Sequence, residues 1–301
     1  MRSIVVFGSL NYDILFEVDR LPTIGETRAA RSVSFQGGGK GANQAVQAAL
    51  LGAPVEMVGA VGTDALGSDL LGRLERAGVG TSHVHRLDEA TGVGVVSFLD
   101  DGAVSATIGR GANFALTEEH VTAAATLFSK ATVAVFQLEN PVMLVARAAG
   151  IAREEGCTVI LNAAPACEIP DSLVDATDVL VVNEVEAAYY LDRDDPVGLV
   201  SAEDAARELQ ARFHAAVIVT MGPDGSFLMD NHGAGAHIPA IPVRAIETTG
   251  AGDSYVGAMA VALARGESLQ DAATYGTLAS SITIQGIGAQ GAMPDATMMA
   301  R

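Results

Sequence analysis

The sequence lacks several features that would point to particular protein classes. It has no tryptophan and only two cysteines, Cys157 and Cys167, among its 301 residues. Two cysteines provide neither a disulfide framework nor zinc-ligand spacing, so nothing indicates an oxidising compartment. No apolar run approaches the length of a membrane span, and the run at residues 4–7 is too short for a signal peptide. We therefore expect a cytoplasmic protein without a membrane-spanning segment.

Positive charge is also scarce. The chain has 18 Lys and Arg residues against 36 Asp and Glu residues, which gives a net charge of −18, and its only lysines are Lys40 and Lys130. Because there is no basic cluster, nucleic acids and anionic membranes are poor partners. A small anionic ligand remains compatible with this composition, since backbone N–H groups can bind an anion locally.

What the sequence does contain is a regular alternation of strand-like and helix-like segments. Continuous Val/Ile runs are typical of strands that are covered on both faces. Their alternation with Ala/Leu-rich stretches predicts an α/β fold with a mostly parallel central sheet. The predicted strands are residues 4–7, 55–61, 133–138, 158–161, 179–182 and 216–220; the predicted helices are residues 42–51, 68–77, 117–128, 141–155, 185–190 and 202–213.

Two regions, residues 12–36 and 91–109, break this alternation. Both contain shorter strands of alternating polarity, with turns at residues 21–25 and 100–102. We expect two hairpins that form a small antiparallel sheet beside the core, where it could act as a lid. No linker divides the chain, so residues 1–301 are expected to form a single domain with the lid inserted in it.

The most informative segment is the stretch from Glu247 to Ser254, which contains Gly250-Ala251-Gly252-Asp253. We interpret the preceding apolar run, residues 238–246, as a strand, and the following small residues as a helix. Glycines and the free N–H groups of a helix start make an anion site. A carboxylate there would repel a bound anion, so its presence needs a reason. One such reason is that Asp253 is a base that deprotonates a hydroxyl while the N–H groups hold a phosphoryl group. The alternative is that Asp253 only caps the helix.

A second glycine cluster, residues 37–45, also precedes a predicted helix. It is not a P-loop, because Gly41 follows Lys40 where Ser or Thr would bind magnesium. Placing one of only two lysines among glycines suggests a ligand site around Gly39 and Lys40. Asn43 would either cap the helix or present its amide to ligand hydroxyls.

Further polar residues follow predicted strands, where ligands of open α/β sheets bind. Asn11 and Asp13 alternate, so in an extended chain both face adjacent hydroxyls of one ligand; the alternative is a local turn. Glu139 follows residues 133–136 and could simply be a charge near a helix start. Residues 183–186 would hold Mg²⁺ directly or through water, or form an acidic helix start. Residues 220–225 would pack against a nucleotide or form a β-turn.

Taken in order, these motifs resemble the ribokinase-like family of sugar kinases over almost the whole chain. The matching positions are residues 8–13, 37–45, 111–113, 139, 162–165, 183–186, 220–225 and 250–253. The resemblance implies a three-layer α/β/α core with a β-sheet lid, and a homodimer formed through the lids. It also implies ATP-dependent phosphorylation of a sugar hydroxyl, with conversion of D-ribose to D-ribose 5-phosphate as the first expectation.

The resemblance also implies roles for individual residues. Asp253 would be the base, and Gly250, Ala251 and Gly252 would form the anion hole. The other expected sites are the sugar site, Asn11, Asp13, Gly39, Lys40, Asn43 and Glu139; the ATP site, Asn183, Thr220, Gly222, Gly225, Gly252 and Thr277; the Mg²⁺ site, Asn183 and Glu186; and a monovalent-cation site, Glu247, Thr249, Thr283, Gly286 and Gly288.

The chain departs from the family pattern at three positions. Glu247 stands where Asp is common, Ala292 where a Ser faces the monovalent ion, and Val182 where Pro is usual. Because the first two changes alter the cation site, we expect potassium activation to be weaker or differently selective. A kinase for another sugar or a nucleoside is the main alternative function, and a non-catalytic sugar- or nucleotide-binding regulator is the other.

Overall fold

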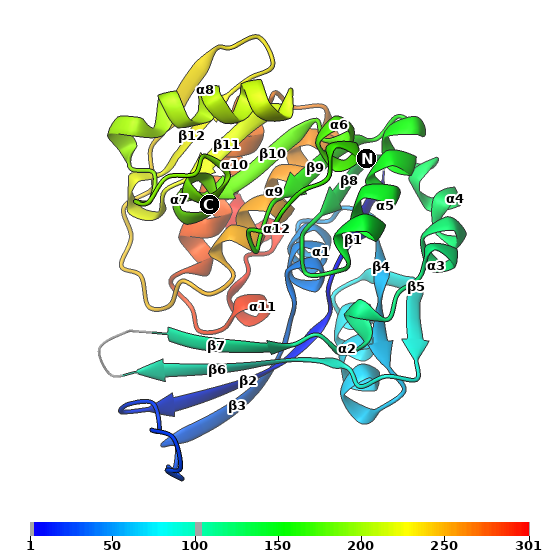
Figure 1. Ribbon diagram of the computed structural model, residues 1–301, viewed down its shortest axis with the longest axis vertical. Helices are drawn as coiled ribbons and strands as arrows, with labels where there is room; N and C mark the ends of the chain where they lie inside the picture. Colours follow the sequence, from blue (N-terminus) through cyan, green and yellow to red (C-terminus); the bar gives the residue numbers. More distant parts are fainter. Residues whose placement is uncertain (1–2, 100–103, 301) are drawn as a thin grey trace.

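The computed structural model describes residues 3–99 and 104–300, which contain two separate β-sheets (Figure 1). The larger sheet has nine strands in the order β13-β12-β11-β10-β9-β8-β1-β4-β5, and the smaller has four in the order β3-β2-β6-β7. No helix in the described ranges is both long and apolar enough to cross a membrane. The turn predicted at residues 100–102 lies outside the described residues.

The large sheet is mostly parallel, as the sequence predicted. Its seven strands from β5 to β11 pair in parallel, with register shifts in the pairs β1–β8 and β4–β5. Only the two pairs at the far edge, β11–β12 and β12–β13, are antiparallel. These strands are β1 (Ser3–Phe7), β4 (Val55–Gly62), β5 (Val79–Leu87), β8 (Ala131–Phe136), β9 (Thr158–Asn162), β10 (Val179–Asn183), β11 (Ala216–Thr220), β12 (Ser226–Met229) and β13 (Gly235–Ile238).

Helices cover both faces of this sheet, which gives the expected three layers (Figure 1). Alternate residues of β1 separate into two apolar clusters: Val5 and Phe7 belong to one, Ile4 and Val6 to the other. The first cluster includes α3 (Glu118–Ala123), α4 (Ala125–Phe128), α5 (Val142–Glu154), α6 (Asp171–Ala176), α7 (Glu184–Tyr190) and α8 (Ala202–Phe213). The second includes α1 (Lys40–Leu50), α2 (Ala65–Arg76), α9 (Ala251–Arg265), α10 (Leu269–Thr283) and α12 (Ala296–Met299).

Two of the sequence predictions about helices and strands are wrong. The helix predicted at residues 117–128 is two short helices, because the Ala124 N–H bonds the Val121 carbonyl in a tighter turn between them. The apolar run at residues 238–246 is not a strand beyond Ile238. Pro239 and Pro242 have no N–H to donate to a ladder, so the chain continues as an irregular loop.

The small sheet consists of two antiparallel hairpins joined along β2 and β6. Its strands are β3 (Ser32–Gly38), β2 (Asn11–Val18), β6 (Gly92–Leu99) and β7 (Val104–Gly109). The prediction of a fully antiparallel sheet is wrong, because β2 and β6 pair in parallel. Both strands follow parallel strands of the large sheet, β1 and β5, and so leave it in the same direction (Figure 1).

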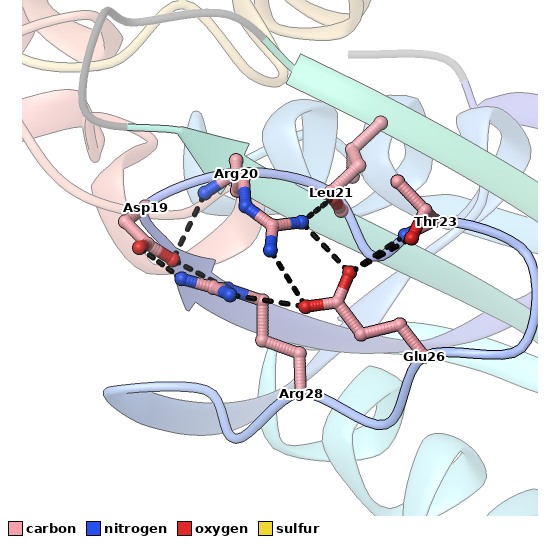
Figure 2. Close-up of polar contacts among 6 residues, drawn as sticks. All are labelled: Asp19, Arg20, Leu21, Thr23, Glu26 and Arg28. Atoms are coloured by element: carbon pink, nitrogen blue, oxygen red, sulfur yellow. Dashed lines mark hydrogen bonds and ion pairs between the residues drawn. The ribbon is translucent and has the colours of Figure 1, made fainter.

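Ion pairs order the loop that connects β2 and β3 (Figure 2). The Glu26 carboxylate accepts hydrogen bonds from Arg20, from Arg28, and from the backbone N–H and hydroxyl of Thr23. Arg28 also pairs with Asp19. Exposed pairs of this kind contribute little individually, but their sharing of Arg28 and Glu26 fixes the shape of the loop.

Four further short helical segments lie within the described residues. These are η1 (Gly111–Phe114), η2 (Leu199–Ser201), η3 (Gly222–Asp224) and α11 (Ala289–Ala292). Figure 1 shows α11 between the main body and the small sheet. The carboxyl ends of the parallel strands, the first turns of α1 and α9, and the small sheet therefore all border one region.

Candidate active site

Asp253 lies in the first turn of α9 and is held there by two side-chain amides. Its Oδ2 accepts a hydrogen bond of 2.9 Å from Asn43 Nδ2, and its Oδ1 accepts one of 2.9 Å from Gln44 Nε2. The residue that caps α9 is Gly250, and no side chain caps it. The alternative that Asp253 is merely a helix cap is therefore wrong. Likewise Gly39, not Asn43, occupies the cap position of α1.

The glycine turn before α9 requires glycine at one position and leaves space at another. Gly250 has a positive φ of 78°, and a Cβ there would lie 2.7 Å from the Ala289 Cβ. A Cβ at Gly252 would meet nothing within 4 Å, so this part of the turn faces open space. The Ala251 N–H already bonds the Thr248 carbonyl at 3.2 Å, whereas the N–H groups of Gly252 and Asp253 belong to the first turn of α9, where a helix offers no carbonyl partner.

Lys40 supplies the positive charge of the site. Burial lowers its pKa, but Asp253, Glu139 and Glu186 outweigh that effect and raise the pKa overall, so Lys40 stays protonated. Its backbone N–H donates to Glu139 Oε2 at 3.1 Å, and the Ser9 hydroxyl donates to the same oxygen. Lys40 and Glu139, which are 99 residues apart in sequence, are thus in direct contact.

The carboxyl group of Asp253 is buried, and its surroundings change its pKa. Burial raises its pKa, while Lys40 and the amides of Asn43 and Gln44 act in the opposite direction. Only 7% of the residue is exposed, so few waters compete for the carboxylate. The overall effect is a raised pKa, so this carboxyl group holds a proton more tightly than an exposed aspartate does.

Asn11 and Asp13 lie on one face of β2, as their alternation predicted. The Asp13 carboxylate lies against two glycines, Gly38 and Gly94. A Cβ at Gly38 would lie 1.9 Å from one of its oxygens, and a Cβ at Gly94 would lie 2.3 Å from the other. Burial, then the charges of Glu139 and Asp253, raise the pKa of Asp13 to about 7. The Asn11 Oδ1 accepts a hydrogen bond of 2.8 Å from Asn113 Nδ2. Asp13 therefore lies close enough to Glu139 and Asp253 for their charges to act on it. Because Asn11 and Asp13 belong to a strand, the local-turn alternative for them is wrong.

Two adjoining pockets open beside Asp253. The polar one, about 220 Å³, is lined by Lys40, Asn183, Glu186 and Asp253 among others. The mainly apolar one, about 600 Å³, includes Thr277 and the turn that carries Gly222 and Gly225. Both pockets share Thr220, Thr248 and Gly252, so together they form one elongated cleft along the start of α9.

The apolar pocket contains residues that the sequence analysis missed. The loop wrongly expected to be a strand supplies Ala240, Ile241, Pro242, Val243 and Ala245 to its wall. The two prolines within this apolar run were the available signal that it forms a loop.

Asn183 and Glu186 form a reciprocal cap at the start of α7. Asn183 Oδ1 accepts from the Glu186 N–H at 2.8 Å, and Glu186 Oε2 accepts from the Asn183 N–H at 2.9 Å. Both residues also line the polar pocket. Burial raises the pKa of Glu186, although the Asn183 N–H and the Lys40 charge act in the opposite direction. Within residues 3–99 and 104–300, no cluster of three or more acidic, His or Cys side chains forms a ready-made metal cage.

Glu247 is only half satisfied. Its Oε2 accepts a hydrogen bond of 2.8 Å from the Gly288 N–H, while its buried Oε1 has no partner in the described part of the chain. The Thr283 hydroxyl lies within hydrogen-bond distance of Ser254 Oγ and the Ala279 carbonyl. A Cβ at Gly286 would lie 2.6 Å from the Ala292 Cβ, so the methyl group of Ala292 faces this loop. An orphaned carboxylate oxygen suits a cation.

An amide network around Asp253 was not predicted. Gln44 Nε2 also reaches Asn162 Oδ1 at 3.0 Å, and Gln44 Oε1 accepts from Gln137 Nε2 at 2.6 Å. Gln290 Nε2 donates to Asn43 Oδ1 at 3.0 Å. Gln44 belongs to the second glycine cluster, but its role depends on contacts with residues more than 90 positions away.

Comparisons with known proteins agree with this architecture. The family model described as pfkB family carbohydrate kinase matches residues 1–296. Ribokinase from Schizosaccharomyces pombe is 34% identical over 303 residues, covering 98% of this chain and 95% of the relative. Deoxyribokinase from Salmonella typhi is 32% identical, covering 97% and 95%. The structure of Arabidopsis thaliana ribokinase complexed with ribose and ATP has a TM-score of 0.91 and 31% identity, covering 99% of this chain and 97% of the other.

Proposed function

This chain belongs to the PfkB family of carbohydrate kinases, and we propose that it transfers the γ-phosphoryl group of ATP to the 5-hydroxyl of D-ribose. The family supports the activity of an ATP-dependent sugar kinase. The choice of ribose as the sugar is supported by the relatives, which are named ribokinases and include one solved with ribose and ATP. The observation that carries the proposal is a buried Asp253 carboxylate, held by two amides beside a helix start that opens onto a cleft.

In the proposed reaction, Asp253 accepts the proton of the primary hydroxyl as its oxygen attacks the γ-phosphorus. The bond between that phosphorus and the β,γ-bridging oxygen of ATP breaks, and ADP leaves. N–H groups at the start of α9 and the Lys40 ammonium offset negative charge on the transferred group. Phosphoryl transfer depends mainly on such positioning and charge stabilisation.

The sugar would lie over β2, against Asn11 and Asp13, with Gly39, Lys40, Asn43 and Glu139 around it. Asp13 and Glu139 present carboxylate oxygens, which accept hydrogen bonds from sugar hydroxyls. Gly38 and Gly94 leave room for the Asp13 carboxylate, and any side chain there would displace it. The convergence of these groups within reach of Asp253 supports a polyhydroxylated substrate.

ATP would occupy the elongated cleft, with its base in the apolar pocket and its phosphates in the polar one. Thr220, Gly222, Gly225 and Thr277 line the first part, and Gly252 lies where both parts meet. Mg²⁺ fits the polar pocket, since Glu186 and Asn183 both line it and offer carboxylate and amide oxygens, the type of ligand that Mg²⁺ prefers. When bound with ATP, Mg²⁺ neutralises phosphate charge, and Asn183 and Glu186 would hold it directly or through water.

A monovalent cation fits the loop below α9 through the unpaired Oε1 of Glu247. Carbonyl or hydroxyl oxygens of Thr249, Thr283, Gly286 and Gly288 would complete its shell. Glu247 reaches one methylene further than Asp, and Ala292 offers no oxygen. The proposed site therefore holds a cation with fewer or rearranged ligands.

We further propose that the four-stranded sheet is the lid of a single catalytic domain, and that two lids pair in a homodimer. On the face of the sheet formed by Val33, Phe35 and Val95, these side chains are 50%, 54% and 38% exposed. A lid would exclude water and so limit hydrolysis of ATP. Burying this face against its copy would remove the exposed apolar surface.

Coupled measurement of ADP release tests the proposed function. The purified enzyme with Mg²⁺ and ATP is compared without sugar and with D-ribose, 2-deoxy-D-ribose, D-fructose, a ribose phosphate and a nucleoside. We expect the highest kcat/KM with D-ribose, and phosphate on the 5-oxygen of the product. A preference for 2-deoxy-D-ribose or a nucleoside would show that D-ribose is not the preferred substrate. No release with any acceptor would contradict the catalytic function.

A further inference from the structure

Gln290 connects α11 to the base through a chain of two hydrogen bonds. Its Nε2 donates to Asn43 Oδ1 at 3.0 Å, and Asn43 Nδ2 donates to Asp253 Oδ2 at 2.9 Å. The three residues come from α11, α1 and α9. Asn43 is only 6% exposed, so water cannot easily replace either bond.

The direction of the first bond decides the direction of the second. A side-chain amide has one accepting oxygen and one donating nitrogen, whereas an ionised carboxylate only accepts. Because Gln290 donates to the oxygen of Asn43, the nitrogen of Asn43 must point at Asp253. If Asn43 turned over, its oxygen would face the carboxylate and repel it.

Gln44, the second amide on Asp253, is oriented in the same way. Its oxygen accepts from Gln137 Nε2 at 2.6 Å, and its nitrogen donates to Asp253 Oδ1 at 2.9 Å. Each oxygen of Asp253 therefore has its own amide donor, and each donor has its own orienting glutamine. Gln137 is completely buried, whereas Gln290 lies at the border with the small sheet.

The amide oxygen of Gln290 faces strand β3 of the small sheet. A Cβ at Gly37 in β3 would lie 2.7 Å from Gln290 Oε1, and a Cβ at Gly288 would lie 2.1 Å from Gln36 Oε1. Strand β3 and the start of α11 are therefore in close contact at two successive positions of the strand. A movement of β3 would change the space around the Gln290 amide.

We propose that Gln290 is a positioning residue that holds Asn43 in the orientation needed to donate to Asp253, and that its contact with Gly37 ties this orientation to the position of the small sheet. The inference rests on the proposed function, since it concerns the same base. Gln290 itself touches neither the sugar nor ATP in this account.

Replacing Gln290 should therefore change turnover more than binding. In Gln290→Met an unbranched chain of similar length keeps the contact with Gly37 but cannot donate a hydrogen bond. Asn43 is then free to turn, and Asp253 loses a hydrogen bond that favours its ionised form. We expect kcat to fall by about 5- to 20-fold, roughly the worth of one hydrogen bond, with the KM for ATP unchanged within twofold.

The pH profile separates positioning from general damage. Loss of a donor raises the pKa of Asp253, so the acid limb of kcat/KM for the sugar should move to higher pH in Gln290→Met. Gln210 is the matched control, because it is also a half-buried glutamine with one amide hydrogen bond, to the Asp230 carbonyl in another part of the molecule. Gln210→Met should leave kcat and the acid limb unchanged.

A double-mutant cycle tests whether Gln290 acts through Asn43. The wild type, Gln290→Met, Asn43→Ala and the double variant are compared by kcat, by pH profile and by melting temperature. We expect Gln290→Met to have no further effect on kcat once Asn43 is alanine. Equal losses in both backgrounds, or an acid limb that does not move, would overturn the inference. If the wild type phosphorylates no acceptor, the proposed function fails instead, so the two failures are distinct.

Discussion

The ionisation of Asp13 should make the empty enzyme less stable as the pH rises. Burial, then Glu139 and Asp253, raise the pKa of Asp13 to about 7, whereas an unfolded Asp titrates near ~3.9. Between these values the folded protein holds a proton that the unfolded chain has released. This contribution to stability is therefore complete below about pH 4 and is lost as the pH rises to about 7. At about 1.4 kcal/mol per pKa unit, the loss amounts to roughly 4 kcal/mol.

Asp13→Asn removes this titration and should therefore be more stable than the wild type at pH 8 in the absence of sugar. Urea unfolding at a series of pH values between 5 and 8 measures the difference directly. We expect the advantage of the variant to grow by about 2–3 kcal/mol across this range, because the wild type loses most of the contribution there. The melting temperature should diverge by several degrees in the same direction.

The same variant should bind the sugar less well. A variant that is more stable but binds less sugar shows that the Asp13 carboxylate serves binding and not stability. Loss of one buried hydroxyl partner costs about 1–3 kcal/mol, and calorimetry with D-ribose measures it. Asp88→Asn, at an exposed position, is the control for the substitution itself and should leave the affinity for D-ribose unchanged. The reasoning is refuted if the unfolding curves of Asp13→Asn and the wild type stay parallel from pH 5 to 8, or if the variant is the less stable one at pH 8.

Three further predictions concern the neighbouring groups. Asn43→Ala should weaken D-ribose binding much more than ATP binding, and calorimetry that shows equal losses would remove Asn43 from the sugar site. Gly252→Ala should keep the wild-type melting temperature but lose ATP affinity, because its methyl group enters the cleft. Gly250→Ala should instead lower the free energy of unfolding by about 1 kcal/mol or more, and with it the melting temperature, because of the positive φ at this position and the close approach of Ala289. Potassium should activate the enzyme weakly or with a different selectivity, since Glu247 is longer than Asp. Initial rates are compared in sodium, potassium and caesium salts at matched ionic strength, and a large potassium-selective rise in kcat would refute this prediction.

The sequence predicted the layers because burial on both faces leaves a strong local pattern. The Val/Ile runs that became β1, β8, β9, β10 and β11 could be recognised without any knowledge of their neighbours. The parallel pairing of β2 with β6 could not, because it depends on the directions in which β1 and β5 leave the large sheet. The loop at residues 239–246 shows the opposite case, in which two prolines outweighed an apolar composition.

The candidate site divides in a similar way. Asp253, Lys40 and Asp13 stand in unusual local surroundings, so they could be selected from the sequence as groups with a chemical role. The sequence also indicated Asn43, but as a helix cap or a sugar ligand and not as a partner of Asp253. Gln44 and Gln290 look like ordinary polar residues until the fold brings α1, α9 and α11 together. Their partners lie more than 200 residues away, and no local pattern specifies an orientation at that distance.

Asp253→Asn tests the central claim most directly, because it keeps the size of the side chain and removes its basicity. Calorimetry would first measure the binding of ATP and D-ribose, and a coupled assay would then measure ADP release at saturating concentrations of both. The account predicts binding of ATP and an unchanged melting temperature, with kcat lower by about 10²–10⁴-fold. A variant that binds both ligands and retains nearly full kcat would show that Asp253 is not the base.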